Sequence, residues 1–229
     1  MKFLKNGYAG LCHLIRGGFF YIFTGSILNK SLAMLSSLII ARLVDKSMYA
    51  NLSFTDNIYS YITLISGLGL PNALLKYCSN DNSISTDAAY IKYSYIVGGL
   101  FDLGISLVAC ILLSVLNIPF PGARRFAWML VLYPLFSYVN TCNLMYMRTQ
   151  FENKRYATTS ILMSIANCFA IAILGYFIGI NGVIISRYFA TILALIYGFL
   201  YLVENAEIAG NKYNIYLTPS EENGELLKL

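Results

Sequence analysis

The segment YSYIVGGLFDLGISLVACILLSVL, residues 93–116, contains a single charged residue, Asp102. An α-helix of roughly 20 apolar residues crosses the hydrocarbon core of a bilayer, and a helix satisfies its own backbone hydrogen bonds there. Five further apolar blocks have a similar length: 19–43, 49–70, 126–147, 157–178 and 182–203. The sequence therefore predicts six transmembrane spans and an all-α, polytopic membrane protein.

The amino-acid composition supports this assignment. Of the 229 residues, 58% are hydrophobic and 12% are charged, and the mean hydropathy is +0.63. A water-soluble domain of this length needs more polar surface than such a chain can supply. The composition therefore argues against a soluble enzyme, a nucleic-acid-binding protein and a disordered tail, and we expect no nucleic-acid partner.

Histidine and cysteine offer little for metal or hydrolytic chemistry. The chain has one histidine, His13, and five widely spaced cysteines without a CxxC motif. Metal centres and Ser/His/Asp triads need their groups close together. We therefore expect no metal, and we interpret the cysteines as small buried apolar residues.

The loops between the spans indicate the orientation, because cytoplasmic loops carry an excess of Lys and Arg. One side has four such residues, Arg42, Lys46, Arg124 and Arg125. The side that includes both termini has ten: Lys2, Lys5, Arg16, Lys76, Lys92, Arg148, Lys154, Arg155, Lys212 and Lys228. A multi-pass protein of the cytoplasmic membrane with both termini in the cytoplasm is therefore expected.

Turn signals and composition divide the chain further. Gly179-Ile-Asn-Gly182 predicts a tight antiparallel hairpin between the fifth and sixth spans, and Pro134 predicts a bend in the fourth. Residues 1–18 are expected to form a basic amphipathic stub on the cytoplasmic leaflet. Residues 19–203 are expected to form a six-helix lobe, followed at 204–229 by a cytoplasmic tail or connector.

Four charged residues fall inside the predicted spans: Lys30, Asp56, Asp102 and Arg187. Each costs at least a few kcal/mol when it faces lipid, so all four are expected to face the bundle interior or a wet cavity. At about 1.5 Å per helical residue, Asp56 and Arg187 lie at similar depth near the outer surface and can pair. Lys30 is near the midplane, too deep to snorkel, and Asp102 can reach the same region. Two structural ion pairs and a cavity for charged cargo or coupling ions both remain as interpretations.

Several segments, in their order along the chain, resemble a known family. They are Gly25-Ser-Ile-Leu-Asn-Lys30, Ile39-Ile-Ala-Arg42-Leu-Val44, Gly67-Leu-Gly-Leu-Pro-Asn-Ala-Leu-Leu-Lys76-Tyr77, the hydrophilic loop 78–92 and the basic loop 148–155. Together they resemble the polysaccharide transporters, the O-antigen type of lipid-linked oligosaccharide flippase in the multidrug/oligosaccharidyl-lipid/polysaccharide exporter superfamily. The resemblance runs from about residue 20 to residue 203. Ala50-Asn51 and Asp56 depart from the family's pattern.

The resemblance implies a function in surface polysaccharide biosynthesis, including lipopolysaccharide O-antigen. The cargo would be an undecaprenyl-pyrophosphate-linked oligosaccharide, moved across the cytoplasmic membrane by alternating access. Lys30, and secondarily Arg187, would be the cavity cations for the pyrophosphate. Asp56 and Asp102 would be counter-charges or ion-coupling sites. The resemblance implies no cofactor.

The same resemblance implies the partners. Family members have two six-helix lobes, so we expect this chain either to be the N-terminal half of a longer or split protein or to pair with a second copy. Membrane lipid and the lipid-linked oligosaccharide are the other expected partners.

Other functions compete with transport of a lipid-linked oligosaccharide. A membrane enzyme acting on polyprenyl substrates needs clustered acids for a metal, or a nucleophile with a base. The spans offer isolated Asp56 and Asp102 and no histidine, so we expect the chain not to be an enzyme. A non-transporting structural subunit and a small homodimeric transporter of other cargo remain as alternatives.

Overall fold

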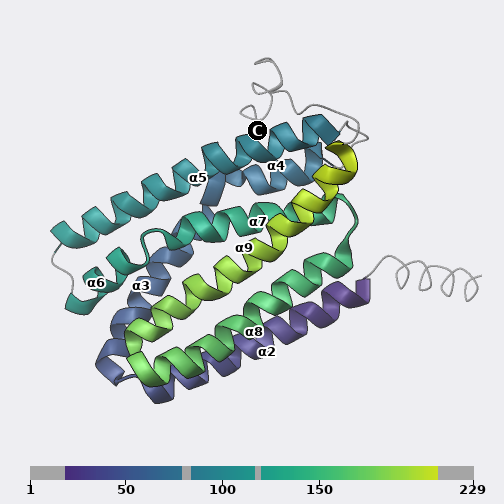
Figure 1. The fold of residues 1–229 in the computed structure, drawn as a ribbon. Helices are drawn as coiled ribbons and strands as arrows, with labels where there is room; N and C mark the ends of the chain where they lie inside the picture. The colour runs from purple at the N-terminus through teal and green to yellow at the C-terminus, as the bar shows by residue number, and fades with distance from the viewer. Residues whose placement is uncertain (1–18, 79–83, 117–119, 211–229) are drawn as a thin grey trace, which may run out of the picture.

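The computed structural model describes residues 19–78, 84–116 and 120–210, and these residues form helices and short connections without strands (Figure 1). The elements are α2 (Phe19–Leu43), α3 (Lys46–Leu64), the 3-10 turn η1 (Ser66–Gly69), α4 (Leu70–Tyr77), α5 (Ile84–Val115), α6 (Pro121–Met129), α7 (Tyr133–Thr149), α8 (Asn153–Ile178) and α9 (Ile180–Gly210). The predicted stub at 1–18 and most of the predicted tail lie outside the described residues. The all-α prediction is confirmed.

Five helical stretches of the described chain are long and apolar enough to cross a membrane: Phe20–Leu43, Lys46–Tyr77, Thr86–Val115, Asn153–Ile178 and Ile180–Val203. The chain is a polytopic membrane protein. The remaining predicted span, 126–147, falls on α6 and α7, which the turn at 130–132 separates. Pro134 is near the start of α7, where its missing N–H is tolerated, so the predicted bend is a break between two helices.

Several predicted boundaries were too narrow. α5 begins at Ile84, inside the expected hydrophilic loop 78–92, and α9 continues to Gly210, inside the expected tail. Hydropathy detects the part of a helix that fits the hydrocarbon core. It does not detect the polar turns by which a helix extends beyond that core, and this explains the difference.

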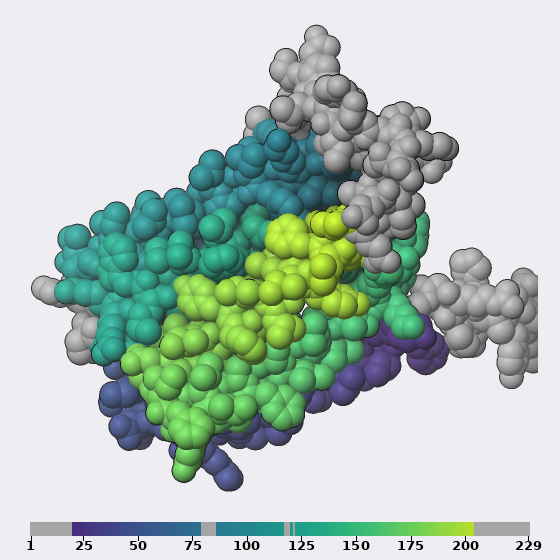
Figure 2. All heavy atoms as spheres, viewed as in Figure 1, coloured from purple at the N-terminus to yellow at the C-terminus, as the bar shows by residue number. Residues whose placement is uncertain are grey.

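The helices form one bundle (Figure 1). α8 packs along both α9 and α2, whereas α2 and α3 touch each other little. α8 and α9 lie side by side on the face shown in Figure 2. Many large apolar side chains are exposed on the outside, such as Leu100 of α5 and Phe177 of α8, as expected for surfaces that face lipid.

The predicted hairpin between the fifth and sixth spans is confirmed at α8 and α9. Gly179 has a φ of +65°, a conformation that glycine adopts without a Cβ penalty. A Cβ at Gly182 would overlap the backbone carbonyl of Leu174. Glycine at this position therefore allows α9 to return closely along α8.

Candidate functional site

An open cavity of about 370 Å³ lies between α2 and α3, with residues of α7, α8 and α9 forming the rest of its lining. Its polar lining consists of Ser36, Ser37, Asp56, Tyr59, Ser60, Thr63, Tyr133, Asn167 and Arg187. The side-chain oxygen of Asn167 is buried and has no hydrogen-bond partner. Because buried polar groups are normally paired, this lining is that of a wet or ligand-binding cavity.

Arg187 and Asp56 form an ion pair in this cavity and join α9 to α3. Nη1 of Arg187 donates to Oδ1 of Asp56 at 2.5 Å, and Nη2 donates to Oδ2 at 2.8 Å. This bidentate geometry is the strongest that a guanidinium and a carboxylate can adopt. The two side chains are 18% and 38% exposed, so the pair is accessible from the cavity. The pairing expected from their depths is confirmed.

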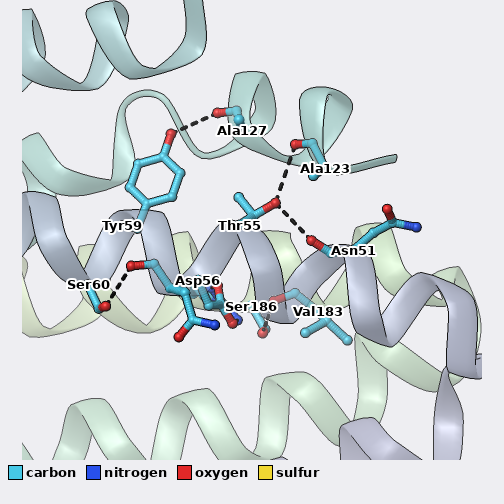
Figure 3. A network of polar contacts seen from close by, with 11 residues as sticks. Asn51, Thr55, Asp56, Tyr59, Ser60, Ala123, Ala127, Val183 and Ser186 are labelled. Carbon is cyan, nitrogen blue, oxygen red and sulfur yellow. Dashed lines mark hydrogen bonds and ion pairs between the residues drawn. The ribbon is translucent and has the colours of Figure 1, made fainter. Parts of the chain in front are cut away.

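A second face of α3, which includes Tyr59 at the edge of the cavity, is fixed to α6 by a further set of hydrogen bonds (Figure 3). Thr55 Oγ1 donates to the carbonyls of Asn51 at 3.0 Å and Ala123 at 3.3 Å. The hydroxyl of Tyr59 donates to the carbonyl of Ala127 at 2.8 Å. Because α3 is held in this rotation, the residues one position further along, Asp56 and Ser60, line the cavity.

Lys30 is placed differently from the other three charged residues. Its side chain is exposed, and among the described residues it has neither Asp56 nor Asp102 as a partner. It lies three residues before Ala33 and seven before Ser37, on the helix face that borders the cavity. From the rise per residue of an α-helix, Lys30 is about 10 Å from Ser37 along the axis of α2. Lys30 is therefore a cation near the cavity without an ion-pair partner in the described chain.

Asp102 is 1% exposed and makes no ion pair with a described residue. Its Oδ1 accepts the backbone N–H of Gly67 at 2.7 Å, and its Oδ2 accepts the hydroxyl of Ser66 at 2.5 Å. The interpretation as two ion pairs is thus wrong for Lys30 and Asp102. The sequence contains a signal for this arrangement, the glycines of Gly67-Leu68-Gly69, but not the identity of the residue that binds them.

Metal-binding groups do not gather in the described part of the chain. No three residues among its His, Cys, Asp and Glu lie close enough together to hold a metal ion. The described cysteines Cys78, Cys110, Cys142 and Cys168 are free thiols, and Cys12 and His13 lie outside the described residues. The chemistry available at the cavity is that of charge pairing and hydrogen bonding.

A protein-family model described as "Polysaccharide biosynthesis protein" matches residues 15–219. The chain belongs to this family. No curated protein and no solved structure gives a match. Members of the family are typically transporters rather than enzymes, and their function is polysaccharide-related membrane transport. The resemblance to the polysaccharide transporters is thereby confirmed at the level of the family.

Proposed function

We propose that this polysaccharide biosynthesis family member forms one lobe of a flippase for undecaprenyl-pyrophosphate-linked oligosaccharides. The observation that carries the proposal is the polar cavity between α2 and α3. Charged and polar groups inside membrane proteins usually line substrate or ion pathways, because they are costly in lipid. A membrane protein of this family that keeps Asp56, Arg187 and several hydroxyls in an open cavity has the features of a transport pathway for a polar cargo.

The charged residues then have distinct roles. Lys30 contacts the pyrophosphate, because its ammonium has no carboxylate partner among the described residues and lies on the cavity side of α2. Arg187 is the second cation, with its charge balanced by Asp56 at 2.5 Å. Asp102 keeps the end of α3 in place through Ser66 and Gly67.

Alternating access requires a second wall for the cavity. The cavity between α2 and α3 is open, and a second six-helix lobe or a second copy of this chain would close it. Rocking of the two lobes about the cavity would expose the cargo to one leaflet and then to the other. In the proposed orientation, both termini are in the cytoplasm and the cargo leaves for the outer leaflet and O-antigen assembly.

Substitution of Lys30 tests the proposal in source cells from which the gene has been deleted. We expect Lys30→Ala to abolish surface polysaccharide and Lys30→Arg to retain part of it, because only a cation at this depth can neutralise the pyrophosphate. Polysaccharide is measured on the cell surface, and an immunoblot of the membranes verifies insertion. Lys154→Ala, at an exposed position of α8, is the matched control. Normal export by a stably inserted Lys30→Ala protein would contradict the proposal.

A further inference from the structure

The stretch from Lys46 to Tyr77 contains a sharp break at residues 65–69. Gly67, Leu68 and Gly69 have φ angles of +57°, +54° and +78°, so three successive residues are left-handed. Asp102 of α5 binds the break through Ser66 and Gly67. Tyr138 of α7 packs against the other side, where a Cβ at Gly67 would overlap its ring. The break is therefore a fixed part of the fold.

A second pocket, of about 230 Å³, lies between this break and α7. We call it the break pocket. Its polar lining is Thr63, Ser66, Asn72, Ser137, Tyr138 and Thr141. Thr63 also lines the cavity that contains Asp56 and Arg187, so the two hollows adjoin along α3.

Three hydroxyl groups of the break pocket donate their proton within the protein and are left as hydrogen-bond acceptors for a ligand. Thr63 donates its proton to the carbonyl of Ser60 at 2.8 Å, Ser66 to Asp102 at 2.5 Å, and Thr141 to the carbonyl of Ser137 at 2.9 Å. A hydroxyl has one proton and two lone pairs, so each of these oxygens still offers lone pairs. A ligand that donates O–H groups fits these acceptors.

Two further side chains of the break pocket complete this pattern. The hydroxyl of Ser137 and the amide of Asn72 have no hydrogen-bond partner among the described residues, and both can donate as well as accept. The rest of the lining includes Leu64, Pro71, Pro134 and Met145, and no charged side chain. Apolar surface beside several neutral hydrogen-bonding groups suits a sugar ring, which has C–H faces and hydroxyl edges.

The break pocket adjoins α3, whereas Lys30 is on α2. From the turn between α2 and α3, Lys30 is about 20 Å along α2 and Thr63 about 26 Å along α3, at 1.5 Å per residue. To place the two parts at these two positions, a ligand with a diphosphate at one end and uncharged sugars at the other has to span the cavity between α2 and α3.

We propose that the break pocket binds an uncharged sugar residue of the cargo whose pyrophosphate is bound at Lys30. This inference rests on the proposed function and assigns the glycan part of the cargo to a separate site. Ser137 and Thr141 contact the sugar, and Asp102 is a positioning residue that holds Ser66 against the pocket.

The test compares two lipids bound to the full chain in nanodiscs, by native mass spectrometry. One lipid is undecaprenyl diphosphate, and the other carries a neutral hexose oligosaccharide on the same diphosphate. The variants are Ser137→Ala with Thr141→Val, which removes two hydroxyls without changing charge, and Lys30→Gln. Thr158→Val is the matched control, because Thr158 makes the same kind of bond to the carbonyl four residues earlier on the exposed side of α8.

Wild-type protein and the Thr158→Val control are expected to bind the glycosylated lipid more tightly than the bare lipid. The double variant should bind the glycosylated lipid about tenfold more weakly, since each lost hydrogen bond accounts for roughly a threefold change, and should bind the bare lipid as before. Lys30→Gln should weaken both lipids. Equal binding of the two lipids by wild-type protein, or an unchanged preference in the double variant, would overturn the sugar site alone. Binding of neither lipid by wild-type protein would overturn the proposed function and the sugar site together.

Discussion

The carboxylate of Asp102 in α5 accepts the backbone N–H of Gly67 at 2.7 Å, so a charge within one membrane-spanning helix holds the break in its neighbour. A broken helix in a bilayer leaves backbone groups that lipid cannot satisfy. Asp102 binds one of these N–H groups and the hydroxyl of Ser66 as well. This residue, which as an isolated acid suggested ion coupling, has a structural reason to be buried.

Replacing Asp102 tests this relationship. Asp102→Leu leaves the N–H of Gly67 without its acceptor, and we expect stability to fall by about 2 kcal/mol, the usual range for an orphaned buried donor. Asp102→Asn retains one carbonyl oxygen and should lose less. Thermal unfolding of the detergent-solubilised proteins gives the order of stability of wild type and the two variants. Equal melting temperatures for Asp102→Leu and wild type would show that the break does not depend on this carboxylate.

Two glycines of the break and one glycine of α5 offer a graded comparison. Gly67→Ala introduces both an unfavourable left-handed residue and an overlap with the Tyr138 ring. Gly69→Ala introduces only the left-handed strain, because nothing lies within 4 Å of its Cβ position, and should cost about 1 kcal/mol.

Gly104→Ala completes this series. It adds a methyl group in open space on the helix α5 and should be neutral or slightly stabilising. The expected order of melting temperatures is Gly104→Ala, then Gly69→Ala, then Gly67→Ala as the lowest. If Gly67→Ala and Gly69→Ala had the same melting temperature, the Tyr138 ring would move aside without a cost in stability.

Charge reversal tests the ion pair in the cavity. Asp56→Arg alone places two cations together and should lower stability by about 2 kcal/mol, less than for a fully buried pair because Asp56 is partly exposed. Adding Arg187→Asp should recover part of that loss, since the double variant restores opposite charges. Membrane insertion and melting temperature are the measurements. Additive losses would indicate that the pair contributes no coupling energy.

Removing the hydroxyl of Tyr59 should lower the stability of the protein, whereas removing the hydroxyl of Tyr61 should not. Tyr59→Phe removes the 2.8 Å hydrogen bond to the carbonyl of Ala127 in a site that is 6% exposed, although this carbonyl still accepts from Cys110 Sγ and from the N–H of Leu130. We therefore expect a loss of about 1 kcal/mol, that of one hydrogen bond. Tyr61 is 69% exposed, and Tyr61→Phe should leave the melting temperature unchanged. If both variants behave alike, the bond between α3 and α6 is not what holds α3 in its rotation.

The local properties of the sequence were enough to predict the fold class, an all-α membrane protein. Long, mainly apolar stretches predicted α2 over residues 19–43 with its observed limits, because partition into lipid depends on the composition of each segment by itself. Glycine at 179 and 182 likewise predicted the α8–α9 hairpin. Asp56 and Arg187 were expected to meet because a fixed rise per residue sets the depth of each charge in its own span.

The tertiary structure decided which partner each charged residue has, because the depth of a residue in its span does not determine its partner. Lys30 and Asp102 are both deep enough to have paired, yet Lys30 is exposed near the cavity and Asp102 binds Ser66 and Gly67. Which partner a charged side chain binds depends on the rotation of its helix about the helix axis and on where the neighbouring helix is broken. Both are set by packing among residues far apart in the chain, such as Tyr138 against Gly67 and Thr55 against Ala123, and hydropathy along one segment contains no information on these contacts.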